Sequence, residues 1–139
     1  MLNTSIETIF MRKMRELPSI VAWIFWLGWT GLFCILMLSP SAGTVKNLSG
    51  FFGGTEITDA VGHVILVGVD CFLLYILMIH YLPDTIARRY SIIVTLMIAI
   101  IVETAQLWIP SRGASMIDIA AAFIGVGIVW WIIRRNIVG

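Results

Sequence analysis

Charged residues are scarce in this sequence. They make up 12% of its 139 residues, whereas 60% of the residues are hydrophobic. A soluble domain averages about 25% charged and about 45–50% apolar residues. The length suits one domain. Because the hydrophobic residues are gathered into four long runs, the composition indicates membrane spans and argues against one large soluble core.

Cysteine is also rare, and this argues against several classes of site. The two cysteines, Cys34 and Cys71, both fall inside apolar runs, where a free thiol behaves as a small hydrophobic group. We therefore expect no disulfide. No CxxC or paired Cys/His spacing predicts a metal, and we expect no cofactor. The net charge of +1 gives no indication of a nucleic-acid partner, and we expect none.

The four apolar runs have the length that a membrane helix needs, about 20 residues. An open sheet cannot satisfy its backbone in lipid, and the runs lack the strict alternation of barrel strands. The first run exceeds the roughly 7–15 residues of a cleavable signal segment, so we expect it to be retained. The sequence predicts an all-α, integral membrane four-helix protein with spans over 19–38, 59–82, 92–109 and 117–133.

The basic residues predict the orientation of these spans. Three lie before the first span, two lie between the second and third, and two follow the fourth, so that seven of the nine share one side. Positive charge marks the cytoplasmic side of a membrane protein. We therefore expect a multi-pass protein of the cell membrane, an antiparallel bundle with both termini cytoplasmic. The seven residues are Arg12, Lys13, Arg15, Arg88, Arg89, Arg134 and Arg135.

Polar residues inside the predicted spans are unevenly placed. An ionisable group at this depth costs roughly 2.5–3.5 kcal/mol and usually faces a bundle interior or a wet cavity. Asp59 and His63 are four residues apart, and Glu103 and Gln106 are three apart, so each pair shares a helix face. With the orientation above, these side chains converge near the outer surface. The predicted outer cluster is Asp59, His63, Glu103, Gln106, Arg112 and Asp118.

A structural interpretation of the same residues stays open. Asp59 and Asp118 suit the N-termini of helices, and Glu103 and Gln106 suit hydrogen bonds between helices. In that case Arg112 neutralises a nearby acid, and the cluster fixes helix pairing without binding anything.

Two further features concern the interior of the bundle. Asp70 lies seven residues beyond His63, so we expect it on the same face but nearer the midplane. Small residues in the fourth span, Ala120–Ala122, Gly125 and Gly127, predict a face that allows close helix packing.

The ordered set of polar motifs resembles the VanZ-like family of small membrane proteins. The pattern runs from Asp59 and His63, opening a span, through Glu103-Thr-Ala-Gln106 to Arg112 and Asp118. The resemblance implies a single four-span transmembrane domain over residues 1–139. The family is named for a protein linked to teicoplanin resistance. Two positions depart from its pattern, since a common asparagine is Ala122 here and a frequent basic residue is Ala60.

Three functions follow as hypotheses. The first is binding of an envelope lipid or glycopeptide headgroup by the outer cluster, with Arg112 as the anion contact. The second is a non-catalytic structural subunit of a larger membrane protein assembly, which Ala60 and Ala122 favour because both positions lack a polar group. The third is an enzyme that uses His63 and Glu103 as base and acid, for which no nucleophile motif, metal set or phosphate loop is present. Expected partners are membrane lipids or that larger assembly.

Overall fold

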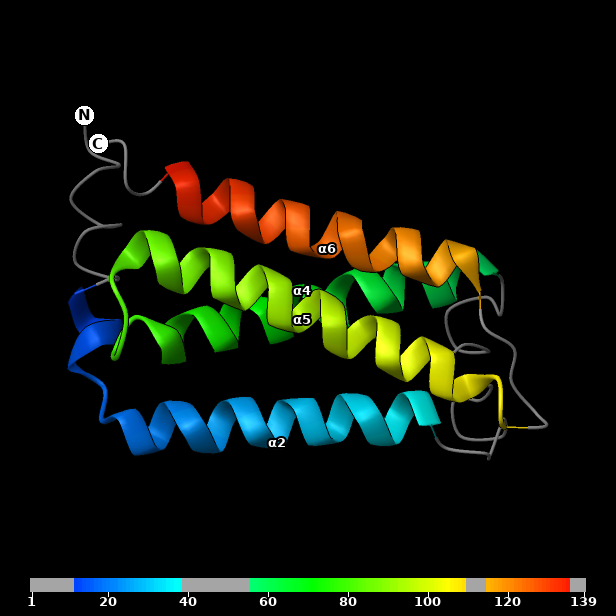
Figure 1. The fold of residues 1–139 in the computed structure, drawn as a ribbon, viewed down its shortest axis with the longest axis horizontal. Helices are drawn as coiled ribbons and strands as arrows, with labels where there is room; N and C mark the ends of the chain where they lie inside the picture. Colours follow the sequence, from blue (N-terminus) through cyan, green and yellow to red (C-terminus); the bar gives the residue numbers. More distant parts are fainter. Residues whose placement is uncertain (1–11, 39–55, 110–114, 136–139) are drawn as a thin grey trace.

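Four long helices make up the fold. The computed structural model describes residues 12–38, 56–109 and 115–135, except for the side chains of residues 56–59 and 135. The helices are α2 (Ser19–Leu38), α4 (Glu56–Met78), α5 (Asp84–Gln106) and α6 (Met116–Arg135) (Figure 1). Each is long and apolar enough to cross a membrane, and the described residues contain no strand. The expected all-α protein with four candidate spans is therefore confirmed.

The turn between α4 and α5 differs from the predicted boundaries. The second span was expected to continue to residue 82, but α4 ends at Met78, and the amide of His80 donates to the carbonyl of Leu77 in the turn that follows. Pro83 precedes the first residue of α5. Pro83 is the N-cap of α5, with φ −55° and ψ 143°, and its carbonyl accepts the amides of Ile86 and Ala87. Pro83 thus both follows one helix and starts the next.

The start of α5 corrects a second boundary. The third span was expected from residue 92, because Arg88 and Arg89 were placed outside the hydrocarbon. Instead α5 begins at Asp84, where a carboxylate at a helix N-terminus is favoured by the dipole. Arg88 lies one turn later, with its guanidinium 3.7 Å from Asp84. The helix therefore extends past its apolar part and carries the charges with it.

The end of α5 tightens before a proline. Its last helical residue is Gln106, three residues before the predicted end. The amides of Leu107, Trp108 and Ile109 each donate to the carbonyl three residues earlier. Because the residue before a proline is disfavoured in the α conformation, Pro110 in the sequence explains why Ile109 does not continue the helix.

Helix α4 is the centre of the bundle. It packs against each of the other three helices, and half of its apolar window is buried, against 17% for α2. Its closest approach is to α6, where a Cβ added to Gly125 would overlap the carbonyl oxygen of Val64 and lie 3.2 Å from the Gly68 nitrogen. The predicted small-residue face is therefore correct at Gly125. It is wrong at Gly127, where an added Cβ would meet nothing within 4 Å.

Helix α2 joins the bundle through polar side chains as well as apolar contact. The Trp29 indole donates to the carbonyl of Leu66 at 3.1 Å. The indole of Trp23 donates to the Tyr81 hydroxyl oxygen at 3.1 Å. The outer face of α2 presents large apolar residues, which suits contact with lipid tails. These exposed residues are Ile20, Ile24, Phe25, Leu27, Leu32 and Ile35.

Asp70 forms a second polar level of the bundle. It is 1% exposed, and it accepts hydrogen bonds from the hydroxyls of Thr30 at 2.6 Å and Thr95 at 3.2 Å. Those threonines belong to α2 and α5, so the carboxyl group links three helices. A buried carboxyl group with partners on each oxygen is satisfied as it stands. Asp70 is best understood as a structural residue.

The close approach of α4 and α6 gives a first prediction. We expect Gly125→Ala to lower the free energy of unfolding by about 1–3 kcal/mol, because the new methyl group must displace backbone. The matched control is Gly127→Ala on the same helix, which has open space and gains up to about 1 kcal/mol in helix propensity. Unfolding of the purified protein in detergent measures both. Equal effects of the two changes would contradict the packing described for Gly125.

The Asp70 level gives a second prediction. We expect Asp70→Ala to destabilise the protein by about 1–3 kcal/mol, since the hydroxyl of Thr95 loses its acceptor and that of Thr30 keeps only the carbonyl of Trp26. Asp70→Asn keeps one carbonyl oxygen and should cost clearly less. The same unfolding measurement compares them. Equal losses for the two variants would show that the negative charge, and not the hydrogen bonds, stabilises this level, because both variants remove the charge.

Candidate functional site

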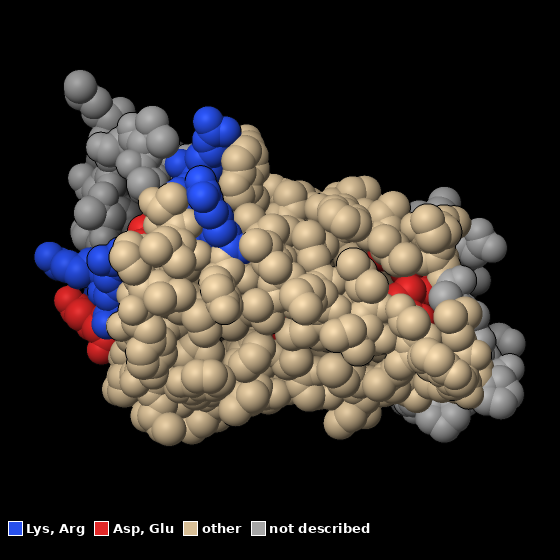
Figure 2. Space-filling model, viewed as in Figure 1, with Lys and Arg blue, Asp and Glu red and all other residues tan. Residues whose placement is uncertain are grey.

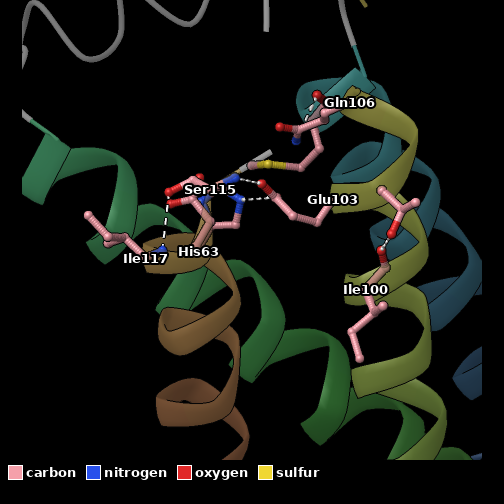
Figure 3. Close-up of polar contacts among 9 residues, drawn as sticks. His63, Ile100, Glu103, Gln106, Ser115 and Ile117 are labelled. Carbon is pink, nitrogen blue, oxygen red and sulfur yellow. Dashed lines mark hydrogen bonds and ion pairs between the residues drawn. The ribbon is translucent and has the colours of Figure 1, made fainter. Parts of the chain in front are cut away.

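Three ionisable side chains from three helices meet at one end of the bundle. His63 lies in the first half of α4, Glu103 lies one turn before the end of α5, and Asp118 lies in the first turn of α6. His63 Nδ1 is 3.5 Å from Asp118 Oδ1, and His63 Nε2 is 4.0 Å from Glu103 Oε2. Figure 3 shows His63 and Glu103 pointing toward one another. We call these three residues the acid–histidine cluster.

The acid–histidine cluster is largely buried. Glu103 is 4% exposed and His63 is 8% exposed, and the side chain of Asp118 is 16% exposed. Two carboxylates this close repel each other in a medium of low dielectric constant unless a positive charge or a proton lies between them. The imidazole ring of His63 is placed where it can supply that charge, since each of its nitrogens faces one acid.

Ser115 supports the cluster from the start of α6. Its hydroxyl oxygen accepts a hydrogen bond from the amide of Ile117 at 3.2 Å, and its own amide donates to Oε1 of Glu103 (Figure 3). This contact joins the end of α5 to the first residue before α6. The sequence analysis did not single out Ser115. A signal was present, because Ser115 and Asp118 have the spacing of a capping box, which marks a helix start.

The other predicted site residues have different outcomes. Gln106 is buried at 2% exposure, but its amide donates to the carbonyl of Met37 at 3.3 Å and so ties α5 to α2. Asp59 lies in α4, and its side chain is outside the described residues, as is the whole of Arg112. The structure therefore brings together three of the six predicted residues and assigns a fourth to helix packing.

A small pocket opens beside the acid–histidine cluster. Its volume of about 10 Å³ is close to what the centre of one water molecule requires. The three cluster residues form its polar wall, and the remaining wall is apolar. That apolar wall consists of Phe33, Leu96, Ala99, Ile100, Val102, Ile119, Ala122 and Phe123.

The donor atoms of the cluster define its chemistry. One imidazole nitrogen and one oxygen from each acid all lie within 4.8 Å of one another. Such a group accepts hydrogen bonds, shares a proton, or holds a cation. The spacing in the sequence does not indicate a metal-ligand set, because the three residues are 40 and 15 positions apart and belong to different helices.

Comparison with known proteins leaves this geometry as the main basis for assigning a function. No family model, curated protein or solved structure matches this chain. The resemblance to VanZ-like proteins accordingly stays a prediction that rests on the motif residues themselves.

Proposed function

We propose that this chain is a multi-pass protein of the cell membrane, an antiparallel bundle with both termini on the cytoplasmic side. The Lys and Arg residues support this orientation, since the basic side chains visible in Figure 2 gather at one end of the molecule. The described basic residues of α5 and α6 are Arg88, Arg89 and Arg134, which come early in one helix and late in the other. The acid–histidine cluster then lies toward the outer surface.

We further propose that the acid–histidine cluster binds the headgroup of an envelope lipid or glycopeptide. The observation that carries this proposal is the meeting of His63, Glu103 and Asp118 beside a pocket at one end of the bundle. Ionisable groups at membrane depth usually mark a functional site. The pocket has room for about one water-sized atom. It would therefore take a single polar atom of the headgroup, and the rest of the lipid would lie outside it.

Glu103 has two roles in this proposal. It accepts the amide hydrogen of Ser115, which stabilises the start of α6, and it also lines the pocket. The hydrogen bond needs only a carbonyl-type oxygen, whereas recognition of a headgroup or ion also uses the negative charge. The two roles can therefore be separated by changing the charge alone. Arg112, as a contact for an anionic group, remains part of the same proposal.

A structural subunit is the second candidate. The exposed apolar face of α2 favours it, because only Ala22, Phe33 and Met37 of that helix are buried. A neighbouring membrane protein would cover such a face as well as lipid does. In this case the acid–histidine cluster serves helix packing, and its variants lose assembly or folding before they lose any ligand.

The orientation is tested by labelling single cysteines from outside the cell. In a background where Cys34 and Cys71 are replaced by alanine, we expect Lys46→Cys to react with a membrane-impermeant maleimide in intact cells. Arg89→Cys should react only after the membrane is opened, because it belongs to the cytoplasmic set. Labelling of Arg89→Cys in intact cells would reverse the orientation and place the cluster on the inner side.

Headgroup binding is tested by purifying the protein gently from its membrane and identifying the retained lipids by mass spectrometry. We expect one lipid or glycopeptide class to stay bound to the wild type. Glu103→Gln should lose it about tenfold or more while remaining folded, because glutamine keeps an acceptor for the Ser115 amide and removes only the charge. Arg112→Ala should lose it as well.

His80→Gln is the control, since the other histidine contacts the carbonyls of Ile76 and Leu17 and lies outside the cluster. It should retain the lipid. If instead Glu103→Gln and Arg112→Ala both fail to fold or to accumulate, the cluster is structural. Recovery of the wild type in fixed ratio with other membrane proteins, and with no retained lipid, would support the subunit.

A further inference from the structure

The acid–histidine cluster has the composition of a metal-ligand set. Its three donor atoms come from three separate helices and lie within 4.8 Å of one another. Two ligands that share one zinc ion are at most about 4.4 Å apart, twice the usual metal–ligand distance. The cluster therefore needs only small side-chain rotations to close around an ion.

The charge of the cluster favours a cation. Two ionised carboxylates and one imidazole carry a net charge of −1 or −2, according to whether the ring is protonated. The described arginines of the same helices are far away, since Arg88 precedes Glu103 by 15 residues and Arg134 follows Asp118 by 16. At 1.5 Å per residue these separations are about 22 and 24 Å. Neither of these two arginines offsets the negative charge of the cluster, and Arg112 lies outside the described residues.

The donor types narrow the choice of ion. Imidazole nitrogen suits zinc and the other divalent transition metals, whereas magnesium and calcium prefer sites made of oxygen alone. Three protein ligands leave a further coordination position open, as in zinc sites that bind a substrate or water. The pocket lies beside the same three residues, where such a position would face.

We propose that His63, Glu103 and Asp118 bind one divalent transition-metal ion, with zinc as the ion to test first, and that the ion receives an oxygen of the bound headgroup. The ion site stands on the cluster alone, whereas the headgroup contact rests on the proposed function. A bound metal ion would make the electrostatic potential in the pocket positive instead of negative. Two carboxylates repel a phosphate group, but the ion that they hold attracts it.

A protonated histidine is the competing explanation of the same geometry. An imidazolium ring between the two acids, 3.5 Å from one and 4.0 Å from the other, would satisfy both without an ion. The two explanations differ in a direct way. The first requires the protein to bind a metal in fixed ratio, and the second requires that it does not.

The test measures zinc on the full-length protein in detergent. After treatment with a chelator and return of zinc, elemental analysis and calorimetry should find one ion per chain. His63→Gln, Glu103→Gln and Asp118→Asn should each weaken zinc binding by about a hundredfold or more, because amides are poor zinc ligands. These changes keep side-chain size and hydrogen-bonding capacity, and gel filtration with circular dichroism verifies that each variant is folded.

Two matched controls carry the same substitutions elsewhere. His80→Gln and Asp84→Asn alter a histidine and an acid outside the cluster, and both should bind zinc like the wild type. Absence of stoichiometric binding of zinc, manganese or iron(II) to the folded wild type would overturn the proposal in favour of the imidazolium. Equal loss in the controls would also overturn it, because the ion would then bind elsewhere.

A second measurement separates this inference from the proposed function. Binding of short-chain phosphatidylglycerol, a phosphate-bearing probe, is compared in the zinc-loaded and chelated protein. Tighter binding to the loaded form supports the ion and its headgroup contact together. Zinc binding that leaves the lipid affinity unchanged overturns the headgroup contact and leaves the ion site standing. Lipid binding by a wild type that takes up no metal overturns the ion site and leaves the headgroup function standing.

Discussion

The close approach of Gly125 to the α4 backbone at Val64 and Gly68 sets the distance between α4 and α6, and the site depends on that distance. His63 lies five residues before Gly68, and Asp118 lies seven residues before Gly125, which is about 7.5 and 10.5 Å along the two helix axes. With no side chain between the backbones, short groups such as His63 and Asp118 reach each other. A wider spacing would leave both in an apolar environment without their neighbour, at a cost that a bilayer makes large.

The two polar levels of the bundle show different physical solutions to the burial of an acid. At Asp70 the partners are uncharged hydroxyls, one for each oxygen, and the level is closed. At the acid–histidine cluster two acids share one imidazole, and a pocket opens beside them. Because the first arrangement gives a hydrogen-bond donor to each oxygen and the second borders a pocket, binding of a ligand or an ion is expected at the second.

Hydrophobicity alone made the spans predictable, and α2 has the bounds that the sequence predicted. The late start predicted for α5 shows the limit of that signal, since Arg88 belongs to the helix but not to its apolar part. Three of the six residues of the predicted outer cluster, His63, Glu103 and Asp118, lie together in the structure. Ionisable residues are rare in apolar runs, and they usually face the bundle interior, where they can contact one another. The partner of Gln106 was not predictable, since the carbonyl of Met37 lies on a helix 69 positions away and its approach depends on packing. The role of Ser115 depended on the same kind of long-range contact.

The sequence order of these contacts has a consequence for biogenesis. Thr30 is synthesised before Asp70, so the acid of the second long helix enters the bilayer with a hydroxyl donor already in place on the first. Thr95 follows later and completes that level. None of the three members of the acid–histidine cluster belongs to α2. His63 is synthesised first, and Glu103 and Asp118 follow on two later helices. The site can therefore assemble only once the last helix has inserted, and a truncated or stalled chain contains the central polar level without the site.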